Sequence, residues 1–309
     1  MVLTHGTFPA RRDFYRLFAE LFVAKGIAVL VFDKRGHGLS TGDPRSSIVE
    51  RADDAEAAVR SLGARPNIDR VGLWGFSNST WSIPLVAARM GSGLACLIAF
   101  GASGVSMGRA EAYRKACELR EAGIAEELIA DVKRTWEILY DYVATGVWQS
   151  AWDTELSALL SVIRGSTALE AVPLRSYVKT DAMLSPIPLA FDLGQFRQTM
   201  GGVMPEMGRD PADDYERVRC PVLFLVGELD ASLPARESAA AVARALEVAR
   251  NPDHTVKVYP QAGHYLNHVA GPAQQAAASE EISRLSFCFA SGVLEKMSAW
   301  AAARLREQG

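Results

Sequence analysis

Residues 71–80 have the sequence VGLWGFSNST, an apolar run that ends in a group of small and polar residues. The run from 71 to 76 is typical of a strand, and a helical pattern follows it from about 79 to 90. A serine on a sharp turn between strand and helix holds its hydroxyl clear of the sheet, and small neighbours on both sides allow that strained turn to form. A G-x-S-x-small segment alone also fits an ordinary loop serine, but the flanking strand and helix favour Ser77 as a nucleophile.

Apolar runs and helical patterns alternate on both sides of this segment. Strands are predicted at 2–4, 27–33, 71–76, 94–100, 221–227 and 255–260. Helices are predicted at 11–26, 51–63 and 79–90, and from about 280 onward. This alternation favours an α/β fold with a mostly parallel sheet and helices on both faces. The continuous β-branched run at 27–33 indicates a buried parallel strand.

The middle of the chain departs from this pattern, because no segment between about 105 and 206 is a convincing strand. Within it, residues 125–146 carry apolar side chains at helical spacing. They are Leu128, Val132, Trp136, Leu139 and Val143. We therefore expect a core domain formed by residues 1–104 and 206–309. Residues 105–205 are expected to form a helical cap over the site, inserted before the strand at 221–227.

The composition limits the possible functions. The 309 residues are 49% hydrophobic, with a formal net charge of −3, a sequence pI of about 6.0 and no basic run. A nucleic-acid partner would require a basic domain or stripe, so none is expected. The four cysteines form no CxxC pair, and we expect neither a metal nor a cofactor. A signal peptide and an apolar run of membrane-spanning length are both missing, which favours a cytoplasmic protein; the oligomeric state is left open.

A serine nucleophile needs a base, which is normally histidine, and the base needs a carboxylate that fixes its tautomer. His264 comes just after the last predicted strand and can reach over the carboxyl ends of the strands. His268 is the backup candidate, one helical turn further on. The carboxylate is Asp230, in the GELD segment that follows the strand at 221–227, with Glu228 as the fallback.

Two backbone N–H groups are candidates for binding an oxyanion. One belongs to Asn78, directly after the serine, and the other to Thr7, in the HGT segment after the first strand. His5 in that segment is interpreted as a residue that holds loops together. The segment FDKRGHGLS at 32–40 is interpreted as a structural support for the HGT loop, with catalysis by His37 or Asp33 as a minority interpretation.

Aromatic residues supply the candidate substrate pocket. They are Phe76 beside the serine and Trp136, Tyr140 and Trp148 in the insertion. Met183 and Phe191 are further candidates. The alternative, which we favour for the insertion's aromatic residues, is that they form its own core.

Five segments, HGT, FDKRGHGLS, GFSNS, VGELDASLP and QAGHYL, together resemble the α/β-hydrolase superfamily in order and spacing. The resemblance covers about residues 1–103 and 207–270, and the second segment is similar to bacterial esterases and acyl-peptidase-like hydrolases. Ser79 stands where the superfamily's elbow motif has its last glycine. The chain also begins almost at the HG strand, whereas family members usually have one or two further strands before it.

The resemblance implies hydrolysis of a small-molecule carboxylic ester through an acyl-enzyme. In this interpretation Ser77 is the nucleophile, His264 the base and Asp230 the acid that supports it. Three alternatives stay open: a hydrolase of small or acylated peptides, a thioesterase, and a non-catalytic ligand-binding protein on the same fold.

Overall fold

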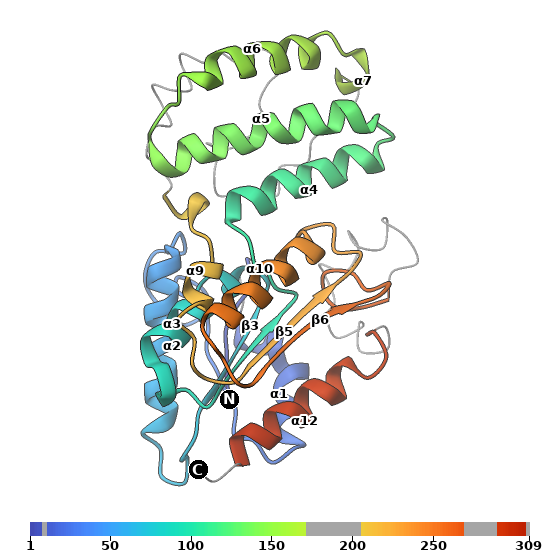
Figure 1. Ribbon diagram of the computed structural model, residues 1–309. Helices are drawn as coiled ribbons and strands as arrows, with labels where there is room; N and C mark the ends of the chain where they lie inside the picture. Colours follow the sequence, from blue (N-terminus) through green and yellow to red (C-terminus); the bar gives the residue numbers. More distant parts are fainter. Residues whose placement is uncertain (8–10, 171–204, 269–288, 307–309) are drawn as a thin grey trace. The chain divides into compact units, whose positions relative to one another are not determined.

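The computed structural model describes residues 1–7, 11–170, 205–268 and 289–306. Within these ranges, six parallel strands form one sheet in the order β2-β1-β3-β4-β5-β6 (Figure 1). Their bounds are β1 Val2–Leu3, β2 Leu30–Val31, β3 Gly72–Phe76, β4 Cys96–Phe100, β5 Val222–Gly227 and β6 His254–Tyr259. The strand order reverses between β1 and β3. In open α/β sheets, ligands bind at the carboxyl ends of the strands at such a reversal.

Helices cover both faces of this sheet, as the alternating pattern predicts. One apolar cluster contains buried residues of α2, α3 and α10, and a second contains those of α1 and α12. Neighbouring strand residues such as Leu73 and Trp74 belong to different clusters, because successive side chains of a strand point to opposite faces. The bounds are η1 Arg12–Tyr15, α1 Arg16–Val23, α2 Ile48–Gly63, η2 Ser77–Trp81, α3 Ile83–Met90, η3 Gly91–Gly93, α9 Ala212–Tyr215, α10 Ala235–Val248 and α12 Val293–Arg306.

The prediction of a buried strand over 27–33 is wrong in length and in burial. β2 comprises only Leu30 and Val31, and both residues are half-buried. In the described part of the chain, β2 is an edge strand that pairs with β1 alone. Because β1 is only two residues long, few residues of 27–33 have a partner strand. The apolar run signals a strand correctly but does not reveal its place at the edge.

Helix boundaries differ from the predicted ones for identifiable reasons. α2 begins at Ile48 because Ser47 and Glu50 form a capping box that satisfies the first N–H groups. The helix predicted at 79–90 is divided, with the 3-10 segment η2 from Ser77 and the α-helix α3 from Ile83. Both differences leave the order of elements unchanged.

The described residues from 106 to 209, together with 231–233, form a second compact unit. Its elements are α4 Met107–Glu121, α5 Glu126–Thr145, α6 Ala151–Arg164, α7 Thr167–Glu170 and η4 Pro205–Gly208. Its main segment, 106–209, lies between β4 and β5 in sequence, and its described residues contain no strand. On α5, Val132, Trp136, Leu139 and Val143 are all buried, in agreement with the predicted helical face.

No helix within the described ranges is both long enough and apolar enough to span a membrane.

Candidate active site

Ser77 lies at the sharp turn where β3 ends and η2 begins. Its backbone φ is +53°, which is uncommon for a residue other than glycine and costs about 1–3 kcal/mol when the surroundings hold it there. Two hydroxyls brace the turn, since Thr80 Oγ1 donates to the Ser77 carbonyl at 2.6 Å and Ser79 Oγ donates to the Phe76 carbonyl at 3.0 Å. Ser77 is half-buried.

Ser79, which replaces the glycine of the family motif, fits the turn without a positive φ. It is 2% exposed, and its Oγ lies above the Gly75 backbone. A Cβ atom built on Gly75 would lie 2.7 Å from both Ser79 Oγ and Ile83 Cδ1, closer than real Cβ contacts allow. The turn therefore needs its first glycine, whereas a small serine is accommodated at the last position.

Gly75→Ala is expected to destabilise the protein by about 1–3 kcal/mol, because the added methyl overpacks the elbow. Equilibrium unfolding in urea measures this change. Gly93→Ala is the matched control, since nothing lies within 4 Å of a Cβ atom built there. Equal stability of the two variants would contradict the close approach at Gly75.

Ser77, His264 and Asp230 form one chain of hydrogen bonds. The distance from Ser77 Oγ to His264 Nε2 is 2.8 Å, and the distance from His264 Nδ1 to Asp230 Oδ2 is also 2.8 Å. A carboxylate accepts only, so Nδ1 carries the proton and Nε2 is left to accept from the serine hydroxyl. The Asp230 side chain is fully buried and that of His264 is 15% exposed. Of the three residues linked by these hydrogen bonds, Asp230 is therefore at the buried end and Ser77 Oγ is at the end where a substrate would bind.

Close contacts with neighbouring backbone and with an aromatic ring hold His264 in place. Gly101, at the end of β4, has φ +55°, and a Cβ atom there would lie 2.5 Å from the His264 carbonyl oxygen. The Phe76 ring lies beside the imidazole, with the ring centroids 5.3 Å apart. The backbone N–H of Leu229 donates to the Ala262 carbonyl at 2.8 Å, which ties the loop of the acid to the loop of the base.

The two fallback residues, Glu228 and His268, make contacts outside the Ser77–His264–Asp230 hydrogen bonds. The Glu228 carboxylate pairs with Arg236 at 2.5 Å. His268 is exposed and lies in an isolated antiparallel bridge with Ala262, so the prediction that it is one helical turn beyond His264 is wrong. The chain makes a tight turn there instead of a helix.

The two predicted oxyanion donors belong to segments next to Ser77, one in sequence and one in space. Asn78 is the second residue of η2, where an N–H group has no partner within the helix. Thr7 follows Gly6, and a Cβ atom built on Gly6 would lie 3.5 Å from Ser77 Cβ, so this loop passes directly beside the serine. Binding of an oxyanion by the two amides stays a prediction.

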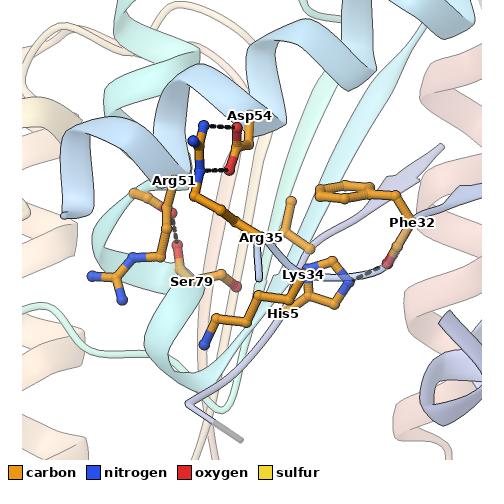
Figure 2. Close-up of a pocket in the computed structure, with 9 residues that line it drawn as sticks. His5, Phe32, Lys34, Arg35, Arg51, Asp54 and Ser79 are labelled. Atoms are coloured by element: carbon orange, nitrogen blue, oxygen red, sulfur yellow. Dashed lines mark hydrogen bonds and ion pairs between the residues drawn. The ribbon is translucent and has the colours of Figure 1, made fainter. Parts of the chain in front are cut away.

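The surroundings of the Thr7 loop are those of a structural support. His5 Nε2 lies 2.5 Å from the Phe32 carbonyl, so this nitrogen is the donor, and burial lowers the pKa of His5 to about 4 (Figure 2). The Asp33 carboxylate accepts from the backbone N–H groups of Leu39 and Arg12, and these bonds lower its pKa. Both side chains have structural partners, which argues against the minority interpretation for Asp33.

The candidate pocket residues are mostly inside apolar clusters. Phe76 is 3% exposed and stacks on Tyr265 at 5.0 Å between ring centroids, and Trp136 stacks on Tyr140 at 5.3 Å inside the second unit. Trp148 is half-buried and packs against Trp152. This burial favours the core interpretation for Trp136 and Tyr140. Met183 and Phe191 lie outside the described residues.

In the part of the chain that the structure describes, no three His, Cys, Asp or Glu side chains are grouped so that they could hold a metal ion.

The parallel sheet, the strained serine turn and the loops at its carboxyl edge define an α/β-hydrolase fold. The chain belongs to the alpha/beta hydrolase family, whose model matches residues 1–278.

Among curated proteins, the chain is 32% identical over 136 residues to the thiohydrolase aneE of Aspergillus aculeatus, which is 43% of this chain and 37% of that protein. It is 42% identical over 81 residues to the quorum-quenching protein AidA of Acinetobacter baumannii, which is 25% of this chain and 27% of that protein. The matched segments thus span about a third of these relatives.

Solved structures resemble the chain over nearly its whole length. VinJ matches with a TM-score of 0.53 and 17% identity, over 98% of this chain and 89% of VinJ. The ferulic acid complex of Est1E from Butyrivibrio proteoclasticus matches with a TM-score of 0.52 and 14% identity, over 99% and 89%. At such identities the likeness establishes the fold.

Proposed function

We propose that the chain is a serine hydrolase that cleaves carboxylic esters of small molecules through an acyl-enzyme. The observation that carries this proposal is the continuous hydrogen-bond chain from Ser77 through His264 to the buried Asp230. This is the geometry that activates a serine hydroxyl, with base and orienting carboxylate both within hydrogen-bond reach.

In the first half of the reaction, Ser77 Oγ attacks the ester carbonyl carbon while His264 Nε2 takes the hydroxyl proton. The imidazolium then gives this proton to the leaving alcohol as the bond between carbonyl carbon and alcohol oxygen breaks. In the second half, a water molecule loses a proton to His264 and attacks the acyl carbon. His264 then gives this proton to Ser77 Oγ as the bond between Oγ and the acyl carbon breaks, which releases the acid and restores both residues. Asp230 stabilises the positive imidazole in both halves.

The N–H groups of Asn78 and Thr7 bind the negative oxygen that forms in each half. A single such donor contributes about 3–4 kcal/mol to lowering the barrier in comparable enzymes. Asn78 also stands at the start of η2, where unpaired N–H groups favour negative charge.

Thioester hydrolysis is the second candidate, since the relatives with matching segments include two proteins named thiohydrolases. The same groups serve both reactions, because a thiolate leaves from the same tetrahedral intermediate as an alkoxide. Turnover of an oxygen ester and of its sulfur analogue with the same acyl group distinguishes the two preferences. Substrate contacts by Phe76, Trp136, Tyr140 and Trp148 stay a prediction, as does a cap function for the helical insertion.

The test is labelling with a fluorophosphonate probe, followed by peptide mapping. The probe forms a covalent bond only with an activated serine, so the expected label is on the peptide that carries Ser77. Ser77→Ala should remove it, while Ser157→Ala, at an exposed position on α6, should leave it unchanged.

A folded wild-type protein that takes no label would contradict the proposal. It would favour a non-catalytic binding protein on the same fold. A label on a serine other than Ser77 would assign the role of nucleophile to that serine.

A further inference from the structure

Lys34 is a buried cation whose ammonium group touches the loop of the predicted oxyanion donor. It follows β2 by three residues and is only 7% exposed. Its Nζ donates to the Gly6 carbonyl at 3.0 Å and to the Thr7 carbonyl at 3.1 Å. A charged side chain is placed in a protein interior at a considerable cost, so these paired contacts call for an explanation.

The contact with the Gly6 carbonyl fixes a peptide plane. In a trans peptide, the C=O and the following N–H point in opposite directions. Because the Gly6 carbonyl points at Lys34, the Thr7 N–H points away from it. Gly6 itself lies beside Ser77, with a built Cβ atom 3.5 Å from Ser77 Cβ.

The same contact strengthens the donor. A hydrogen bond to a charged group is roughly twice as strong as a neutral one, and hydrogen bonds in a chain polarise one another. An ammonium on the Gly6 oxygen therefore draws electron density from the peptide and makes the Thr7 N–H a better donor. The Gly6 N–H is held separately, by the Tyr15 hydroxyl at 2.8 Å.

We propose that Lys34 is a positioning residue that orients and polarises the Gly6–Thr7 peptide so that the Thr7 N–H binds the oxyanion. This inference rests on the proposed function of Ser77. Lys34 acts through the peptide and touches no reacting atom.

The surroundings of Lys34 lower its pKa, so that the charge of its ammonium group depends on pH. The pocket around Lys34 has an empty volume of about 330 Å³, part of which is open solvent, and it contains several charged groups (Figure 2). Burial first, and then the positive charge of Arg51, lower the pKa of Lys34 to about 8. Lys34 is therefore charged below about pH 8 and loses its proton above it. The other titratable or charged groups at this pocket and in its loop are His5, Asp33, Arg35, His37 and Asp54.

Arg35 and Asp54 pair with each other across this pocket, from the loop after β2 to α2 (Figure 2). His5 is neutral at neutral pH because burial lowers its pKa to about 4. Lys34 is therefore the group at this pocket whose pKa is set near 8 and which also touches the loop.

The test uses Lys34→Met, which keeps most of the side-chain length and removes the charge. With an ester substrate, kcat should fall about ten- to hundredfold with little change in KM, less than for loss of a whole oxyanion donor. The wild-type kcat should also decline above about pH 8, and this decline should be absent in Lys34→Met. Lys34→Arg should recover part of kcat and move the decline to higher pH, because a guanidinium stays charged. Lys296→Met, at an exposed position, controls for the lost charge.

A Lys34→Met protein with wild-type kcat would overturn the inference. So would a low kcat that keeps the wild-type alkaline decline, since that is the result of a purely structural contact.

A measurement that needs no turnover separates this inference from the proposed function. The ¹⁵N–¹H signal of the Thr7 amide should shift with a midpoint near pH 8 in the wild type and not in Lys34→Met. If the wild type is inactive yet shows this titration, the proposed function fails and the positioning contact stands. If Thr7 shows no such titration, the inference about Lys34 is wrong whatever the activity.

Discussion

His264→Ala is expected to lower kcat by about 10⁶-fold, the size of the loss when the base of a comparable serine triad is removed. Both ring nitrogens are engaged, Nε2 with Ser77 and Nδ1 with Asp230, each at 2.8 Å, so alanine breaks both links at once. KM should change little, because the imidazole acts on protons in the transition state. Steady-state kinetics with an aryl ester measures both constants.

His268→Ala is the matched control for this prediction. His268 lies four residues further along the chain and is exposed, so its loss should leave kcat within about twofold. A large loss in His268→Ala with a small one in His264→Ala would move the base to His268. Circular dichroism and a thermal melt of each variant show whether the fold is kept.

The central strands and the residues that follow them could be predicted from sequence, for a physical reason. A strand buried on both faces has a continuous apolar run, and the chain must leave the sheet where that run ends. Ser77 and Asp230 stand just beyond such runs, after the buried strands β3 and β5, and His264 follows β6, whose residues are mostly half-buried. Parallel strands end at the same edge, so sequence order alone brings these residues to one edge of the sheet.

The length of the edge strand β2 could not be predicted in the same way. The residues at 27–33 have the composition of a buried strand, but the ladder of β2 is limited by its one neighbour, β1. Strand length depends here on a partner 27 residues or more away in the chain, and a local pattern holds no information about it.

Contacts with backbone carbonyl oxygens are the second feature that could not be predicted from the sequence. Lys34 is not singled out by any pattern, since its two acceptors are carbonyl oxygens and every residue has one. Gly101 is similar, because its importance comes from the approach of the His264 carbonyl across the sheet edge. A lysine at the end of an apolar run, next to residues that must be buried, is the signal that could have pointed to Lys34.

Asp230→Asn is expected to lower kcat by about 10⁴-fold while the protein keeps its fold. Asparagine has nearly the same shape, but its amide can present a donor where the carboxylate accepts from Nδ1–H. The imidazole is then favoured in the tautomer that carries its proton on Nε2, where it can no longer accept the proton of Ser77. The positive imidazole would also lose the negative charge of Asp230, which is fully buried and acts in a poorly screened environment.

Glu228→Gln separates this effect from a general loss of charge near the site. Glu228 forms an ion pair with Arg236, whose side chain is 82% exposed. Loss of the Glu228 charge should therefore change kcat less than about threefold. The deciding comparison is the pair of variants in one ester assay, with fluorophosphonate labelling rates as a second readout. If Glu228→Gln costs more than Asp230→Asn, the carboxylate that supports His264 is Glu228. The 2.8 Å hydrogen bond between His264 Nδ1 and Asp230 would then not be the one that orients the base. Loss of the bond that fixes the tautomer must lower kcat more than loss of a surface ion pair does.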